Sequence, residues 1–123
     1  MNRPVVLLVD DEPNIRETLS FILEMEGFAV ETAANGKEGL ERIYALKPPV
    51  VLLDAMMPII DGFEVCRTVK GDKSLAGTLI IMLTALGQRT DQDRAFSVGA
   101  DYFVKKPFDE EELLALLRTL TSG

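Results

Sequence analysis

The sequence predicts one α/β domain in which a parallel sheet carries helices on both of its faces. Short, unbroken apolar runs alternate along the 123 residues with segments whose apolar residues recur at helical spacing. The runs are apolar throughout rather than at every second position, as expected of strands that are buried on both faces. The segments between the runs are long enough for the helical crossovers that parallel strands require. This alternation predicts five strands and five helices.

The first two strand-and-helix units lie before residue 50. We expect strands at Val5–Val9 and Phe28–Thr32, because both are short apolar or β-branched runs. Helices are expected from Pro13 to Gly27 and from the Asn35-Gly36 turn to about Leu46. Phe21 lies off the first helical stripe, which fits either a wide apolar arc or a docking face. The buried stripes are expected to be Ile15, Leu19, Ile22 and Leu23 in the first helix, and Leu40, Ile43 and Tyr44 in the second.

The middle of the chain contains the most apolar strand, Val50–Asp54, which ends on a carboxylate. Asp61 is a suitable N-cap for a helix from Phe63 to about Val69, and residues 72–78 are expected to form a loop. Leu79–Leu83 is the next fully apolar strand. The core face of the intervening helix is predicted to carry Val65, Cys66 and Val69.

The last third of the chain begins with a helix over Gln88–Val98 whose apolar stripe is poor, so we expect it to be held loosely. Tyr102–Val104 is the last strand. Asp109 and Glu112 form a capping-box pattern at the start of the final helix. The buried stripe of that helix is predicted to be Leu113, Leu116, Leu117 and Leu120.

Composition and charge exclude several classes of protein. The formal net charge of −7, with no Lys/Arg cluster beyond Lys105-Lys106, argues against contact with nucleic acid. The apolar run near the amino terminus is too short for a signal peptide core or a membrane span, and the single cysteine, Cys66, fits a reducing compartment. We therefore expect a cytoplasmic domain without membrane contact. The absence of histidine leaves the chain without an imidazole base or ligand.

Polar and charged residues follow most of the predicted strands directly. They are Asp10 and Asp11 after the first strand, Asp54 at the end of the third, Thr84 after the fourth and Lys106 near the end of the fifth. Because the carboxyl ends of parallel strands meet at one edge of a sheet, these side chains should gather there. Three carboxylates beside one lysine need a cation, and oxygen ligands alone favour a hard ion such as Mg²⁺.

Taken in order, these residues resemble the receiver domain of two-component response regulators, of the CheY-like superfamily. The resemblance covers essentially the whole chain and is carried by Asp10-Asp11, Asp54, Met57-Pro58, Asp61-Gly62, Thr84, Gly99-Ala100-Asp101 and Lys106-Pro107. It implies a flavodoxin-like, doubly wound (βα)5 sheet with strand order 2-1-3-4-5. Residues 1–123 would then be one receiver domain, either standing alone or as the first domain of a longer regulator.

The resemblance also implies roles for the residues at the strand ends. Asp54 would accept a phosphoryl group from a sensor histidine kinase, a histidine phosphotransfer protein or a small acyl phosphate. Mg²⁺ would be held by Asp11, Asp54 and the backbone carbonyl of Met56, with Asp10 assisting largely through water. The phosphoryl oxygens would be bound by Thr84, the backbone N–H of Ala85 and Lys106. The family pattern places the functional lysine directly before the proline, which selects Lys106 over Lys105.

Further expectations from the resemblance concern the switch. Thr84 and Phe103 would form the switch pair, with Phe103 where the family often has tyrosine, and the Lys106-Pro107 peptide would be cis. The helix over 88–98, the last strand and the last helix would form the face that phosphorylation changes, and that face could also form a homodimer. The first helix would help to bind the donor. Met56 and Leu86 carry no polar group to orient an attacking water, so we predict slow loss of the phosphoryl group.

Two functions from other classes are weighed against this one. A haloacid-dehalogenase-like phosphatase also uses Asp, Thr, Lys and Mg²⁺, but its nucleophile lies in an Asp-x-Asp pattern after the first strand, where this chain has Asp10-Asp11-Glu12. A receiver used only for docking or dimerisation, without phosphorylation, would not need an acidic pair, a threonine and a lysine at one edge. A dinucleotide-binding domain fits less well still, because the first turn is acidic and lacks G-x-G-x-x-G.

Overall fold

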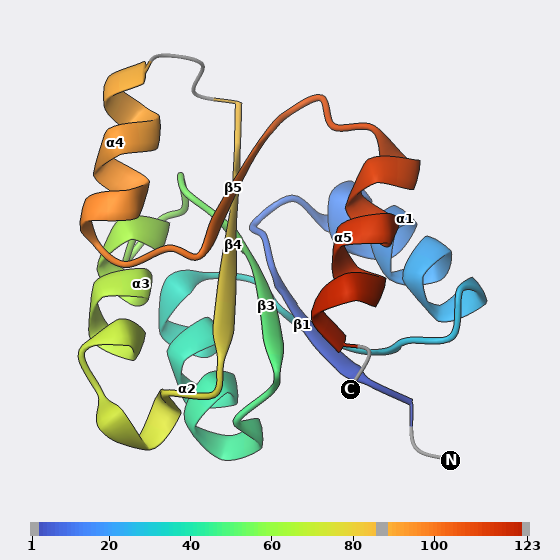
Figure 1. Ribbon diagram of the computed structural model, residues 1–123, viewed down its shortest axis with the longest axis horizontal. Coiled ribbons are helices and arrows are strands. Elements are labelled where there is room, and N and C mark those ends of the chain that lie inside the picture. The colour runs from blue at the N-terminus through green and yellow to red at the C-terminus, as the bar shows by residue number, and fades with distance from the viewer. Residues whose placement is uncertain (1–2, 86–88, 122–123) are drawn as a thin grey trace.

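The computed structural model describes residues 3–85 and 89–121, which form one five-stranded parallel sheet between two layers of helices (Figure 1). The elements alternate along the chain as predicted. They are β1 (Val5–Val9), α1 (Pro13–Met25), β2 (Ala29–Ala33), α2 (Gly36–Leu46), β3 (Val50–Asp54), α3 (Gly62–Lys70), the short 3₁₀ helix η1 (Lys73–Leu75), β4 (Leu79–Thr84), α4 (Arg89–Ser97), β5 (Tyr102–Lys105) and α5 (Glu110–Thr121).

The sheet has the order β2-β1-β3-β4-β5, and all neighbouring strands are parallel, which confirms the predicted fold class. Helices α2, α3 and α4 cover one face of the sheet, and α1 and α5 cover the other (Figure 1). The order reverses at β1 and β3, so the loops that follow these two strands diverge to opposite sides. Such a switch point opens a crevice at the carboxyl edge of the sheet.

The strands supply two separate apolar cores, one on each face of the sheet. Leu7 and Val9 of β1 pack toward α2 and α3, whereas Val6 and Leu8 of the same strand pack toward α1 and α5. β3 divides in the same way, and all of its residues are buried. Burial on both faces explains why these strands are apolar at every position.

One predicted core residue is wrong. Tyr44 was expected in the buried stripe of α2, but it is 43% exposed and its hydroxyl donates to Asp72 Oδ2 at 3.0 Å. The helix approaches the sheet through Gly39 instead, where an added Cβ would lie 2.9 Å from Val9 Cγ1. Because Gly39 and Ile43 are the residues of α2 that are buried against the sheet, Tyr44 lies at the exposed side of the helix.

Most element bounds agree with the prediction to within one or two residues. The predicted loop over 72–78 contains η1, where Asp72 accepts from the Ser74 backbone N–H at 2.9 Å and Leu75 is buried. The predicted start of the fourth helix, Gln88, lies outside the described residues, and α4 is described from Arg89. Within α4 only Ala95 is buried, in agreement with its poor stripe.

Candidate metal centre

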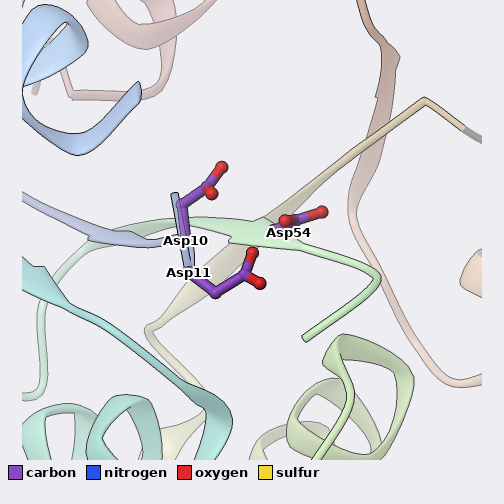
Figure 2. A group of neighbouring side chains, drawn as sticks. All are labelled: Asp10, Asp11 and Asp54. Carbon is purple, nitrogen blue, oxygen red and sulfur yellow. The ribbon is translucent and has the colours of Figure 1, made fainter. Parts of the chain in front are cut away.

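Three carboxylates meet where β1 and β3 end. One oxygen of each of Asp10, Asp11 and Asp54 lies within 4.8 Å of the others, and Figure 2 shows the three side chains next to one another. Asp10 and Asp54 are buried, and Asp54 is only 6% exposed, whereas Asp11 is exposed. The register explains the meeting, because Val9 pairs with Leu53 and both strands continue into their acidic residues at the same edge.

Lys106 brings one positive charge to this cluster from the end of β5. Its Nζ lies 3.0 Å from Asp10 Oδ2 and 3.8 Å from Asp54 Oδ2. The backbone N–H of Lys106 donates to the Thr84 carbonyl at 2.8 Å and extends the β4–β5 ladder by one residue. The peptide bond that follows, Lys106-Pro107, is cis. The neighbouring Lys105 is exposed, so only one of the two lysines lies at the cluster.

The position of Asp10 is fixed by hydrogen bonds from the loop and helix that follow it. Asp10 Oδ1 accepts from the Glu12 backbone N–H at 2.9 Å, and the Asp10 carbonyl accepts from Arg16 Nη1 at 2.7 Å. Glu12 and Arg16 were not among the predicted site residues. Arg16 lies in the first turn of the helix that follows the acidic pair. This position is the only signal in the sequence that could have indicated its contact with Asp10.

Burial raises the pKa of Asp54 to about 6, against an ordinary value of 3.8. The Lys106 ammonium lowers this pKa, and the negative charge of Asp10 raises it. The backbone N–H of Met56 also lowers it, by donating to Asp54 Oδ1 at 3.3 Å. With all three carboxylates ionised, one ammonium leaves two negative charges uncompensated. This imbalance is the electrostatic property that a bound cation would correct.

A cavity of about 220 Å³ opens beside these groups. Its walls are formed by Asp11, Glu12, Asp54, Met56, Thr84, Ala85 and Lys106. The donor set is entirely oxygen, with neither histidine in the sequence nor Cys66 nearby, and two of its members are buried and ionisable. Such a set fits a hard divalent cation that keeps part of its water shell, and Mg²⁺ is the ion of this kind most used beside phosphate.

The loop between β3 and α3 holds Asp54 and Met56 in place. The Gly62 backbone N–H donates to the Ala55 carbonyl at 2.9 Å, and Asp61 caps α3 by accepting from the Glu64 N–H at 2.9 Å. A Cβ at position 62 would lie 2.8 Å from Ala55 Cα and closer still to the Asp54 carbonyl oxygen. Only glycine allows this close approach of α3 to the end of β3.

Thr84 and Phe103, the pair expected to form the switch, share one face of the sheet. Phe103 pairs with Met82 in the register and packs against the same core cluster as Met82. Thr84 follows Met82 by two residues in β4 and is buried, so alternation places it on that face as well. Tyr102 is exposed on the strand next to Phe103. Leu86, which together with Met56 led to the prediction that the phosphoryl group is lost slowly, lies outside the described residues.

No described helix combines the length and the apolar composition that would let it cross a membrane.

The chain matches the family model of the response regulator receiver domain over residues 6–118. It is 43% identical to the DNA-binding dual master transcriptional regulator RpaA of Synechocystis sp. over 117 residues, which are 95% of this chain and 48% of that protein. The chain thus spans about half the length of the curated relatives it matches.

Solved structures of similar chains have the same fold. The chemotaxis protein CheY4 of Vibrio cholerae superposes with a TM-score of 0.88 at 34% identity, covering 97% of this chain and 99% of that one. The BeF₃-activated N-terminal receiver domain of Klebsiella pneumoniae RstA superposes with a TM-score of 0.88 at 29% identity, covering 95% of this chain and 98% of that one.

Proposed function

Because this chain belongs to the response regulator receiver domain family, which serves in two-component systems, we propose that Asp54 accepts a phosphoryl group in a Mg²⁺-dependent reaction. The observation that carries the proposal is the cluster of Asp10, Asp11 and Asp54 with Lys106 in contact with it. The donor is a sensor histidine kinase or a histidine phosphotransfer protein, since the chain has no histidine of its own. We place the exchange in the cytoplasm.

The reaction uses Asp54 as the nucleophile. One oxygen of its ionised carboxylate forms a bond to phosphorus while the bond from phosphorus to the imidazole nitrogen of the phosphohistidine breaks. The imidazole keeps that electron pair and takes up a proton. The raised pKa of Asp54, about 6, still leaves the carboxylate ionised at neutral pH, so it remains available for attack.

The other residues of the pocket bind and orient the transferred group. Lys106 is the nearest ammonium to Asp54 and is suited to a phosphoryl oxygen, as are the Thr84 hydroxyl and the Ala85 backbone N–H at the cavity wall. Asp11, Asp54 and the Met56 carbonyl would hold Mg²⁺, with Asp10 assisting through water. When bound, Mg²⁺ supplies positive charge that offsets the acidic cluster and the incoming phosphoryl oxygens.

The signal leaves the site through Thr84 and Phe103. Phosphorylation of Asp54 adds negative charge at the pocket, and Thr84 is the donor on β4 that can turn toward it. Phe103 on the same face then fills the space that Thr84 leaves. We propose that the face built by α4, β5 and α5 changes in consequence and contacts either an output domain or a second copy of the chain.

A direct experiment separates this function from its alternatives. The chain is incubated with Mg²⁺ and acetyl phosphate and analysed by mass spectrometry, with Asp54→Asn as the control. A receiver gains one hydroxylamine-labile phosphoryl group on Asp54, and the variant does not. A phosphatase would release phosphate continuously without retaining the group, and a docking module would remain unlabelled. Labelling of Asp54→Asn equal to that of the parent would refute the proposal.

A further inference from the structure

The Arg16 side chain donates to a backbone carbonyl, although acidic residues surround it in the sequence. Its Nη1 lies 2.7 Å from the Asp10 carbonyl oxygen. Asp11, Glu12 and Glu17 all lie within five residues of Arg16. No ion pair joins Arg16 to a carboxylate in the part of the chain that the structure describes. Because a bond to a carboxylate is the stronger one for a guanidinium, neutralisation of nearby acids does not explain where Arg16 lies.

The place of Arg16 in α1 is also unfavourable for a cation. The helix begins at Pro13, so Arg16 lies in its first turn, where unpaired backbone N–H groups carry partial positive charge. A positive side chain is repelled there, and carboxylates are the favoured occupants. Arg16 is half-buried as well, which restricts its rotamers. The hydrogen bond to Asp10 must therefore outweigh these costs.

The carbonyl of Asp10 needs a donor because the whole residue is buried, with an exposed fraction of 0%. The Asp10 backbone N–H donates to the Ala33 carbonyl at 3.1 Å, and β2 ends at Ala33. The neighbouring strand thus has no further residue to pair with the Asp10 carbonyl. Among the described residues, the donor that satisfies this carbonyl is Arg16 Nη1.

This hydrogen bond holds the peptide plane between the two acids that follow β1. The Asp10 carbonyl and the Asp11 N–H belong to one planar unit, so fixing the carbonyl also fixes the direction in which Asp11 leaves that plane. The Asp10 carboxylate is held separately, by the Glu12 N–H at 2.9 Å and the Lys106 ammonium at 3.0 Å. The Asp11 carboxylate is exposed and makes no hydrogen bond to another described residue. Its place beside Asp54 therefore depends on the backbone.

We propose that Arg16 is a positioning residue for Mg²⁺ binding, which holds the Asp10–Asp11 peptide and so keeps the Asp11 carboxylate directed to the cluster. Arg16 is not one of the residues that line the acidic cavity, so it acts through Asp11 rather than on the ion. Groups that orient metal ligands in this way typically change metal affinity by about 10-fold to 100-fold when they are removed. This role rests on the proposed function, which brings Mg²⁺ to the cluster.

The sign of the change in Mg²⁺ affinity separates positioning from a plain effect of charge. Arg16→Met removes the guanidinium and keeps an unbranched stem. If Arg16 acted only by its charge, the variant would leave the cluster more negative and Mg²⁺ would bind more tightly. Loss of positioning has the opposite effect. Arg42→Met is the matched control, because Arg42 is an exposed arginine on α2 that pairs with Glu31 at 3.2 Å and does not line the cavity.

Binding of Mg²⁺ alone is measured by isothermal titration calorimetry on the full chain at constant ionic strength. We expect the Kd for Mg²⁺ to rise about tenfold in Arg16→Met and to stay within about twofold of the parent in Arg42→Met. In labelling by acetyl phosphate, the Mg²⁺ concentration that gives half of the maximal rate should rise by the same factor in Arg16→Met. The rate at saturating Mg²⁺ should stay within about twofold of the parent.

An unchanged or smaller Kd in Arg16→Met would overturn the positioning role, even if urea denaturation showed a loss of stability, because Arg16 would then only tie α1 to β1. Should Arg16→Met fail to fold, Arg16→Lys replaces it, since lysine keeps the charge but has a shorter, single donor. Weaker Mg²⁺ binding by that variant supports the role, and an equal Kd overturns it. A parent that neither binds Mg²⁺ nor accepts a phosphoryl group from acetyl phosphate would instead reject the proposed function, and the role of Arg16 with it.

Discussion

The ammonium of Lys106 lies 3.0 Å from the Asp10 carboxylate, although 96 residues separate them in the chain. Asp10 is fully buried, and the same ammonium is 3.8 Å from Asp54. In this structure the closest ion pair of the site thus joins the lysine to the acid on β1 and not to the proposed phosphoacceptor. Lys106, which follows β5, therefore balances both buried carboxylates.

Replacement of this lysine should destabilise the metal-free domain. Lys106→Met leaves Asp10 and Asp54 facing each other without a positive charge, and we expect the free energy of unfolding to fall by about 2 to 3 kcal/mol in EDTA at pH 7. Urea denaturation measures the change. Lys105→Met is the matched control, because Lys105 is exposed and should alter stability by less than about 0.5 kcal/mol. Equal effects at the two positions would contradict the ion-pair account.

Removal of the Asp54 charge should have the opposite effect. The pKa of Asp54 is raised in the folded chain to about 6 from 3.8, so the folded state binds more protons than the unfolded state between these values. The contribution of Asp54 to stability in EDTA is therefore most favourable below pH 4 and is lost as the pH rises through 6. With allowance for screening by water in the cavity, Asp54→Asn should stabilise the domain by about 1 to 2 kcal/mol at pH 7.5.

The gain from Asp54→Asn should largely disappear at pH 3.5, where the parent carboxyl is neutral in the folded state and mostly neutral in the unfolded state. Urea denaturation at the two pH values tests this difference. Asp72→Asn offers a control of opposite sign, because hydrogen bonds from Ser74 lower the pKa of Asp72 and its charged form is the favoured one. A gain for Asp54→Asn that is the same at both pH values would show that packing, and not charge, causes it.

Gly62→Ala should be poorly tolerated. The new Cβ would meet the backbone of Asp54 and Ala55, which cannot move without shifting the end of β3, and we expect a loss of about 3 kcal/mol in unfolding free energy. Gly77→Ala is the comparison, since an added Cβ there meets nothing within 4 Å. That variant should be neutral or more stable by up to about 1 kcal/mol. Similar denaturation curves for the two variants would contradict the close contact at Gly62.

The phosphoryl group on Asp54 should be lost over minutes or longer in the absence of a phosphatase. Met56 lines the cavity but has no hydrogen-bonding group on its side chain to orient an attacking water. The time course of the hydroxylamine-labile mass, after removal of acetyl phosphate, gives the rate. Met56→Gln should shorten the lifetime by supplying such a group. A parent half-life of a few seconds would refute this prediction.

Most residues of the pocket could be predicted because they lie at or just after the end of an apolar run, whereas Glu12 was not predicted. Asp54 at the end of β3 and Thr84 at the end of β4 needed only the assumption of parallel strands to be placed at one edge. The strand order itself came from the resemblance to a known family, since periodicity does not say which strands are neighbours. The small buried surface of α4 was also predictable, because its sequence contains few apolar residues that could be buried.

The sequence by itself determined the number and order of the elements and the acidic character of one sheet edge, because apolar periodicity and strand exits are local properties. Only the tertiary structure decided that Lys106 pairs most closely with Asp10, that Gly39 rather than Tyr44 faces the sheet, and that Arg16 donates to the Asp10 carbonyl. These features depend on distances between elements remote in the chain and on how closely a helix or a loop approaches its neighbour. Such distances are set by packing of the whole domain, and no local pattern of residues contains them.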